Sequence, residues 1–238
     1  MSGPSEPDPF YRAVEEAFVR RRGAPLLLSP RDWALIGRWK ETGVPLRIVL
    51  QGIDNMFDAW ERRSVLAPRA RRINSLAYCR QEVQSLHDLY RTLHAPAAGR
   101  PEGSPGAGVI LGQHLGRLAR SVRSAMAAAS ATGRDRLVGA LAATAADLRR
   151  QRKDATSGAL PAATEAVLAR LDAGLLAAGR ETLTGEELQA LEAEAAGALE
   201  PVRGRMSAEA LASTRAAFLA RALRRRLSLP RLTLFDGG

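Results

Sequence analysis

Residues 46–60 constrain the fold of this chain more than any other stretch. Large apolar side chains recur there at intervals of three and four residues, which places them on one face of an α-helix. They are Leu46, Val49, Leu50, Ile53, Met56, Phe57 and Trp60. The surrounding segment 29–93 also holds all three tryptophans and the single cysteine. We therefore predict a helical N-terminal domain whose core lies in residues 29–93.

Alanine, rather than large side chains, supplies much of the apolar content of the later residues. The chain of 238 residues is 46% hydrophobic but only 5% aromatic. Alanine favours helices, and the β-branched residues that favour strands are sparse. We predict an all-α fold, with an N-terminal four-helix unit, an Ala/Leu-rich helical bundle and an extended C-terminal tail.

Helix start and stop signals mark several boundaries. Asp8 before Pro9 predicts a capped first helix, because a carboxylate caps the helix and proline suits its first position. Ser29-Pro30-Arg31-Asp32 predicts the start of a second helix, and Gly43 predicts its left-handed end. Thr184-Gly185-Glu186-Glu187 predicts the start of an acidic helix.

The stretch 95–108 contains three prolines and four glycines, which is typical of a linker. It separates two regions of different composition. The predicted organisation is disorder over 1–7, an N-terminal helical domain over 8–94, a flexible linker over 95–108, a C-terminal helical bundle over 109–226 and an extended tail over 227–238. Pro230 excludes a continuous helix through the tail.

The formal net charge of +10 favours a polyanionic partner, nucleic acid above all. Two arginine clusters are the candidate phosphate contacts, because guanidinium groups match phosphate geometry. They comprise Arg62, Arg63, Arg69, Arg71 and Arg72 in a connector, and Arg224, Arg225 and Arg226 at a helix end. The alternative is that these arginines are solvated helix ends, where cations complement the helix dipole.

The C-terminal stretch Leu232-Thr233-Leu234-Phe235 resembles the short peptide by which bacterial replication and repair proteins bind the sliding clamp of DNA polymerase. Such peptides typically read Gln-Leu-Ser/Asp-Leu-Phe, whereas Arg231 stands at the Gln position here. The resemblance implies that Arg231, Leu232, Leu234 and Phe235 bind the clamp, with the apolar side chains in adjoining pockets. The alternative is that the tail packs onto the protein's own helices.

Residues 29–93 resemble the helical domain of DnaD-like primosomal proteins. The shared pattern is a helix, the turn Trp39-Lys40-Glu41-Thr42-Gly43-Val44-Pro45, and a long helix that carries Ile53 and Phe57. The closing Tyr-x-x-x-Ile-x-x-x-Trp signature of that family is absent from residues 73–83. The resemblance points to DNA replication, without the signature on which DNA remodelling would depend.

No residue pattern predicts catalysis or a cofactor. Cys79, His87, His94 and His114 are the only nitrogen or sulfur ligands for a metal, and Cys79 belongs to an apolar helix face, so a buried thiol is expected there. We expect no metal site and no enzyme. No secretory signal and no apolar run of membrane-spanning length is visible, so we expect a soluble cytoplasmic protein with no membrane partner.

Two functions remain open at this point. The first is a non-catalytic accessory protein of bacterial DNA replication or repair that binds the sliding clamp through its tail and binds DNA or a partner through its arginines. The second is a helical scaffold or adaptor that never meets DNA. In that case the acidic segment 181–200, which carries six Glu and no Lys or Arg, pairs with the chain's own basic segments.

Overall fold

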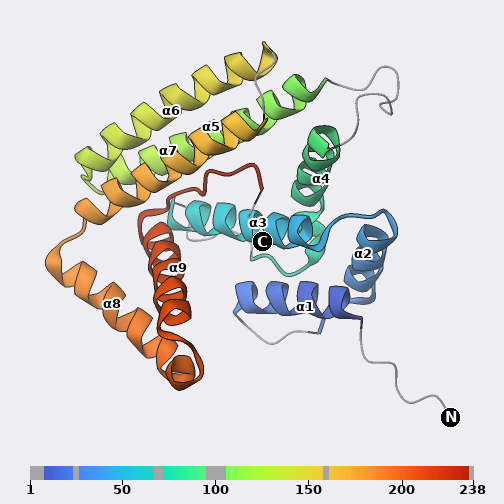
Figure 1. The fold of residues 1–238 in the computed structure, drawn as a ribbon, viewed down its shortest axis with the longest axis horizontal. Helices are drawn as coiled ribbons and strands as arrows, with labels where there is room; N and C mark the ends of the chain where they lie inside the picture. The colour runs from blue at the N-terminus through green and yellow to red at the C-terminus, as the bar shows by residue number, and fades with distance from the viewer. Residues whose placement is uncertain (1–7, 24–26, 67–71, 95–105, 158–160, 236–238) are drawn as a thin grey trace. The chain divides into compact units, whose positions relative to one another are not determined.

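The computed structural model describes residues 8–23, 27–66, 72–94, 106–157 and 161–235 (Figure 1). All regular structure in these ranges is helical, which confirms the predicted all-α fold. The chain divides into two compact units, Met1–His114 with Leu234–Gly238, and Leu115–Thr233. The predicted disorder of residues 1–7 and most of the predicted linker 95–108 lie outside the described residues.

Within the described ranges, four α-helices and one 3-10 helix precede the predicted linker, and five α-helices and one 3-10 helix follow it. The helices are α1 (Pro9–Arg22), α2 (Pro30–Glu41), α3 (Leu46–Leu66), the short 3-10 helix η1 (Leu76–Cys79), α4 (Arg80–His94), α5 (Ala107–Ala131), α6 (Asp135–Thr156), α7 (Pro161–Glu181), α8 (Gly185–Leu199), the 3-10 helix η3 (Glu200–Arg205) and α9 (Ala208–Leu227). Helix α5 begins at Ala107, so the last two residues of the predicted linker are helical.

The predicted capping signals are confirmed at the helix ends. Asp8 accepts a hydrogen bond from the Phe10 N–H at the start of α1. Ser29 and Asp32 form a reciprocal capping box on α2. Gly43, just beyond α2, has a φ of 70°, the left-handed conformation that glycine adopts without steric cost.

Helix α3 lies at the centre of the first unit and contacts both α1 and α4. Val49 and Ile53 of the predicted apolar face are fully buried, and Phe57 is 2% exposed. Ile48 and Gln51 are buried as well, so neighbours cover α3 on more than the one side that the sequence pattern predicts. The core prediction for 29–93 is therefore confirmed in part, because the same core also includes Val14, Phe18 and Leu28, which precede that range.

Gly52 allows α3 and α4 to approach closely. A Cβ atom at this position would lie 2.5 Å from Val83 Cγ2 and 3.1 Å from the Val83 backbone N and Cα atoms. Those backbone atoms cannot rotate away as the end of a long side chain can. The contact between these two helices therefore requires glycine at position 52.

Asp32 is a buried carboxylate that joins two segments far apart in sequence. Its Oδ1 atom accepts hydrogen bonds from the Leu76 N–H at 2.8 Å and the Ser75 hydroxyl at 2.7 Å, while Oδ2 accepts from Ser29. Burial alone would raise the pKa of Asp32, but these hydrogen bonds outweigh burial and lower it below its ordinary value. The carboxylate thus fixes the start of α2 against η1.

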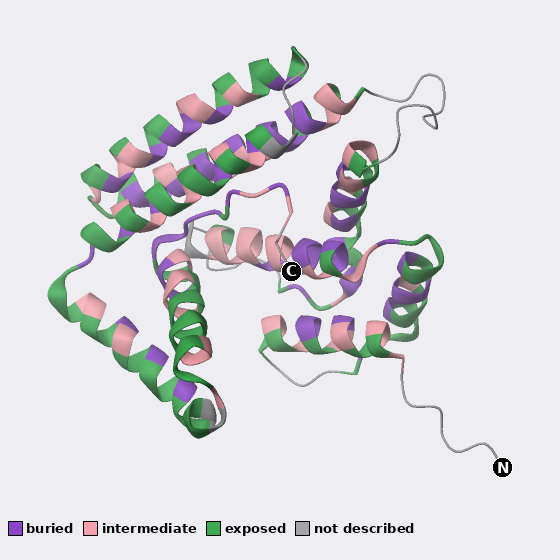
Figure 2. Cartoon of the chain, in the orientation of Figure 1, coloured by how far each residue is buried: buried purple, intermediate pink, exposed green. Residues whose placement is uncertain are grey.

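In the second unit, α6 packs on α7, α8 pairs with α9, and α7 also contacts α9. Figure 2 shows the buried residues of α6 confined to one side of the helix. The largest buried side chains there are leucines, and alanines fill the positions between them. The fully buried leucines of α6 and α7 are Leu137, Leu141, Leu148 and Leu168.

Replacing Asp32 by alanine should lower the free energy of unfolding by about 2–4 kcal/mol, because the buried Leu76 N–H loses its acceptor and the capping box of α2 loses its Asp32 side-chain half, while Ser29 still caps the helix. Urea unfolding followed by circular dichroism measures the change. Asp88→Ala is the matched control, since Asp88 is exposed and accepts a surface hydrogen bond from Gln84. A loss no larger than that of the control would contradict the role given to Asp32.

Gly52→Ala and Gly139→Ala should have opposite effects on stability. At Gly52 the added methyl meets the Val83 backbone, and we expect a loss of about 1–3 kcal/mol. Gly139 lies within α6 with nothing within 4 Å of an added Cβ, so alanine there should stabilise by up to about 1 kcal/mol. Thermal and urea unfolding of both variants measure the change in the free energy of unfolding. Equal changes would show that the α3–α4 contact can accommodate a methyl group at position 52, contrary to the close packing described above.

Candidate binding site

The C-terminal segment that follows α9 is non-helical, and each of its residues described below contacts helices of its own unit. Within the second unit, Leu227 and Leu229 lie over Gly179 of α7, where a Cβ would come within 2.9 and 3.1 Å of their Cδ1 atoms. The Leu232 N–H donates to Asp172 Oδ1 at 2.8 Å. The Thr233 hydroxyl donates to Glu165 at 2.7 Å.

The predicted clamp-binding residues are mostly covered. Leu232 is 1% exposed and Leu234 is 2% exposed. In the first unit, Phe235 packs edge-on against Tyr90 with ring centroids 5.7 Å apart, and Gln51 donates to the Leu234 carbonyl at 3.2 Å. Arg231 is the exposed member of the set. The described part of the segment is non-helical, as Pro230 predicts, but the apolar side chains that a clamp would have to bind are packed within the protein itself.

The first arginine cluster is only partly exposed. Arg63 and Arg72 are exposed, whereas Arg62 is half-buried and its burial lowers its pKa, with the carboxylates of α3 opposing that shift. Arg69 and Arg71 lie outside the described residues. Two of the three described arginines of the connector are therefore placed to contact phosphate.

The second arginine cluster is paired with carboxylates of the same unit. Each of its three guanidinium groups contacts an acidic side chain from α7 or α8. The pairs are Arg224–Asp172, Arg225–Glu194 and Arg226–Glu187. A phosphate contact at this helix end would have to compete with these carboxylates, as the scaffold interpretation of the acidic segment anticipates.

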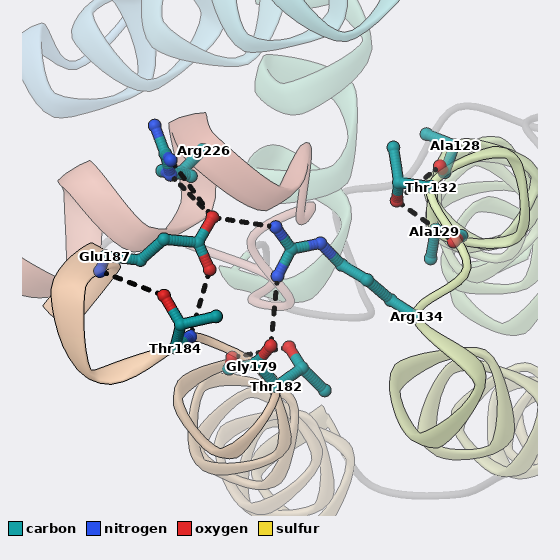
Figure 3. Close-up of polar contacts among 9 residues, drawn as sticks. All are labelled: Ala128, Ala129, Thr132, Arg134, Gly179, Thr182, Thr184, Glu187 and Arg226. Carbon is teal, nitrogen blue, oxygen red and sulfur yellow. Dashed lines mark hydrogen bonds and ion pairs between the residues drawn. The ribbon is translucent and has the colours of Figure 1, made fainter.

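Glu187 is the most highly connected of these carboxylates (Figure 3). It completes the predicted capping box with Thr184 and accepts from Arg134 at 3.0 Å and from Arg226 at 3.0 Å. Arg134 also donates to the Thr182 carbonyl at 3.1 Å. The Thr184 N–H contributes most to the stabilisation of the charge, and with the two arginines it outweighs burial and lowers the pKa of Glu187 to about 2. One carboxylate thereby joins α6, α8 and α9.

A pocket of about 300 Å³ lies among α7, α8 and α9 of the second unit. Alanine and leucine side chains form its wall, and Arg180 and Glu192 are its charged residues. The leucines of the wall are Leu176, Leu188, Leu191, Leu219 and Leu223. Ligand sites in proteins are commonly apolar pockets of about 300–1,000 Å³ with a few polar groups. The pocket therefore has the size and composition of a small binding site.

Sequence reasoning did not find this pocket. The leucine spacing of α8 indicated an apolar face, but the same spacing occurs on any helix that packs fully. The pocket stays open because alanines of α9 face the leucines of α8. Which residues of the two helices face each other is decided by the tertiary packing.

Cys79 is buried in the first core, as predicted, and burial raises the pKa of its thiol to about 12. Burial also lowers the pKa of His87, and Arg91 adds to that effect. His94 stacks on Tyr90 with ring centroids 4.2 Å apart. Across the described ranges, no group of three or more His, Cys, Asp or Glu side chains is placed to hold a metal ion. None of the described helices combines the length and apolarity that a membrane crossing needs.

A family model described as "Uncharacterised protein" matches residues 8–95. The matched range covers α1 to α4 and begins and ends within one residue of the predicted N-terminal domain. No curated protein and no solved structure matches the chain. The resemblances to clamp-binding peptides and to DnaD-like proteins remain predictions.

Glu187→Gln should lower the free energy of unfolding by about 1–2 kcal/mol at pH 7, because Arg134 and Arg226 lose their shared anion. The folded-state pKa of Glu187 is about 2, below the ordinary 4.5, so its stabilising effect is complete above pH 4.5 and disappears as the pH falls toward 2. Urea unfolding of both proteins from pH 7 to pH 2.5 should show the difference shrinking. Glu186→Gln, on the exposed neighbour, is the control. A difference that persists unchanged in acid would contradict the charge-based explanation.

Proposed function

We propose that the protein is a non-catalytic helical adaptor of the cytoplasm, which binds a partner protein through an exposed apolar patch of its first unit. The proposed patch is made of the exposed side chains of Leu27, Trp33 and Tyr78. Leu27 is 89% exposed, Tyr78 is 41% exposed and Trp33 is 36% exposed. Exposed apolar side chains that gather on one surface mark interaction sites, and Trp and Tyr are enriched among the residues that dominate binding energy.

The three residues lie on segments that Asp32 brings together. Leu27 is two residues before the helix cap Ser29, and Trp33 directly follows Asp32. Tyr78 belongs to η1, whose first N–H donates to Asp32. This shared carboxylate is the observation that carries the proposal, because it gives three residues from two distant parts of the chain one rigid support.

Trp33 is also oriented by its aromatic neighbour. Its ring stacks on Tyr11 with centroids 5.9 Å apart and an interplanar angle of 23°. The Lys40 ammonium lies 5.8 Å from the Tyr11 centroid. An aromatic side chain held in this way loses little conformational entropy on binding, which favours a protein contact.

The pairing of the second arginine cluster supports an adaptor over a DNA-binding protein. Charges that already contact Asp172, Glu187 and Glu194 release few counterions when a polyanion arrives. Their contribution is to cross-link helices, which is the role that the scaffold hypothesis assigns to them.

The accessory protein of DNA replication or repair is the second candidate, favoured by the exposed Arg63 and Arg72 and by the sequence of the tail. Clamp binding in this case requires Leu232 and Leu234 to leave their buried positions. The expected signs are DNA affinity that falls steeply with salt and clamp affinity that is lost in the double variant Leu234→Ala, Phe235→Ala.

Site-specific photocrosslinking tests the adaptor proposal. A photoreactive amino acid placed at position 33 or 78, in cells that make the protein, should give one common protein adduct, because both positions lie in the patch. The same amino acid at the exposed position Gln84 of α4 is the matched control and should not give that adduct. Mass spectrometry identifies the product.

Fluorescence anisotropy with duplex DNA at 50 and 200 mM salt completes the test. An adaptor shows no binding at either concentration. Binding that weakens about tenfold or more between them, and that Arg63→Ala with Arg72→Ala reduces, would favour the DNA accessory protein instead. No adduct at positions 33 and 78 would remove the patch from consideration.

A further inference from the structure

The pocket among α7, α8 and α9 is left open by small side chains. Ala216 and Ala220 stand four residues apart on α9, so they lie on the same helix face. Both line the pocket, as does Ala177 of α7. Leucines at these positions would fill the space, as they do elsewhere in the unit. The cavity therefore arises where alanines from two helices meet the leucines of α8.

The charges at the pocket are unevenly paired. Glu192 contacts Arg215 closely, whereas the Arg180 guanidinium lies 3.9 Å from the same carboxylate. A separation of 3.9 Å exceeds hydrogen-bonding distance, so this contact is electrostatic only. The Arg180 side chain is 63% exposed. Because Arg215, which does not line the pocket, already pairs closely with Glu192, the Arg180 guanidinium at the pocket is only weakly neutralised.

We propose that this pocket binds a linear acyl carboxylate, with the acyl chain among the alanines and leucines and the carboxylate on Arg180. The planar guanidinium fork of arginine matches the two oxygens of a carboxylate. One guanidinium beside the Glu192 carboxylate suits a monoanion better than a phosphate dianion, which Glu192 would repel more strongly. The site is separate from the Leu27, Trp33 and Tyr78 patch, and the proposal does not depend on the adaptor function.

Isothermal titration of the full chain with hexanoate, octanoate and decanoate, each below its micelle-forming concentration, tests the apolar part of the proposal. The dissociation constant should fall about fourfold for each methylene that enters the pocket. Ala216→Leu should end this gain at a shorter chain, because the added side chain occupies part of the cavity. Circular dichroism verifies that helix content is unchanged in each variant.

The anionic part is tested with decanoate against decyltrimethylammonium and with Arg180→Gln. Decanoate should bind at least tenfold more tightly than the cation, and Arg180→Gln should weaken decanoate about tenfold without changing the gain per methylene. Arg203→Gln is the matched control. Its side chain is 70% exposed in the same unit and pairs with Glu200, and it should leave binding unchanged.

Several results would overturn the proposal. They are the absence of binding by all three acids, an affinity independent of chain length, equal binding of the cation, and an Arg180→Gln variant that binds as the unchanged protein does. Sedimentation supplies one more. If Ala216→Leu abolishes a dimer of the unchanged protein, the pocket holds a second copy of the chain instead of an acyl carboxylate.

Discussion

Close approach between helices at positions without a side chain is the constraint on which this structure depends. At Gly52 the absence of a side chain brings α3 against the backbone of Val83, and at Gly179 it admits Leu227 and Leu229. Dispersion contacts weaken quickly with distance. The core of the second unit consists mostly of leucine and alanine, so it gains dispersion energy only when helix backbones come close. The glycines and alanines of this chain are the means of that approach.

Charge pairing follows from the same shortage of apolar volume. Arg134, which immediately precedes α6, and Arg226 of α9 both contact Glu187 of α8. Such partly buried, multiply hydrogen-bonded pairs hold helices in register more effectively than isolated surface pairs. Several arginines of the second unit therefore connect its own helices. Their presence is no sign of an external partner, and this weakens the inference from net charge to nucleic acid.

The two proposed sites arise from opposite consequences of packing. The hydrogen bonds of Asp32 fix the start of α2 against η1, the two segments that carry Trp33 and Tyr78. Exposed apolar side chains on a fixed backbone suit a protein partner. Among α7, α8 and α9, alanines leave a space that the helices do not close, which suits a small apolar ligand. Neither site needs a reactive group.

The sequence by itself determined the fold class, the capped helix starts at Asp8, Ser29 and Thr184, and the core face of α3, because these depend on neighbours within one or two turns of helix. Only the tertiary structure decided the environment of Leu232 and Leu234, the carboxylate partners of the arginines at the end of α9, and the pocket beside Arg180. These depend on residues tens of positions apart, such as Arg224 and Asp172, which the spacing within either helix does not relate. The sequence of a non-helical tail is the same whether the tail is packed or free, because its burial depends on the helices that it contacts.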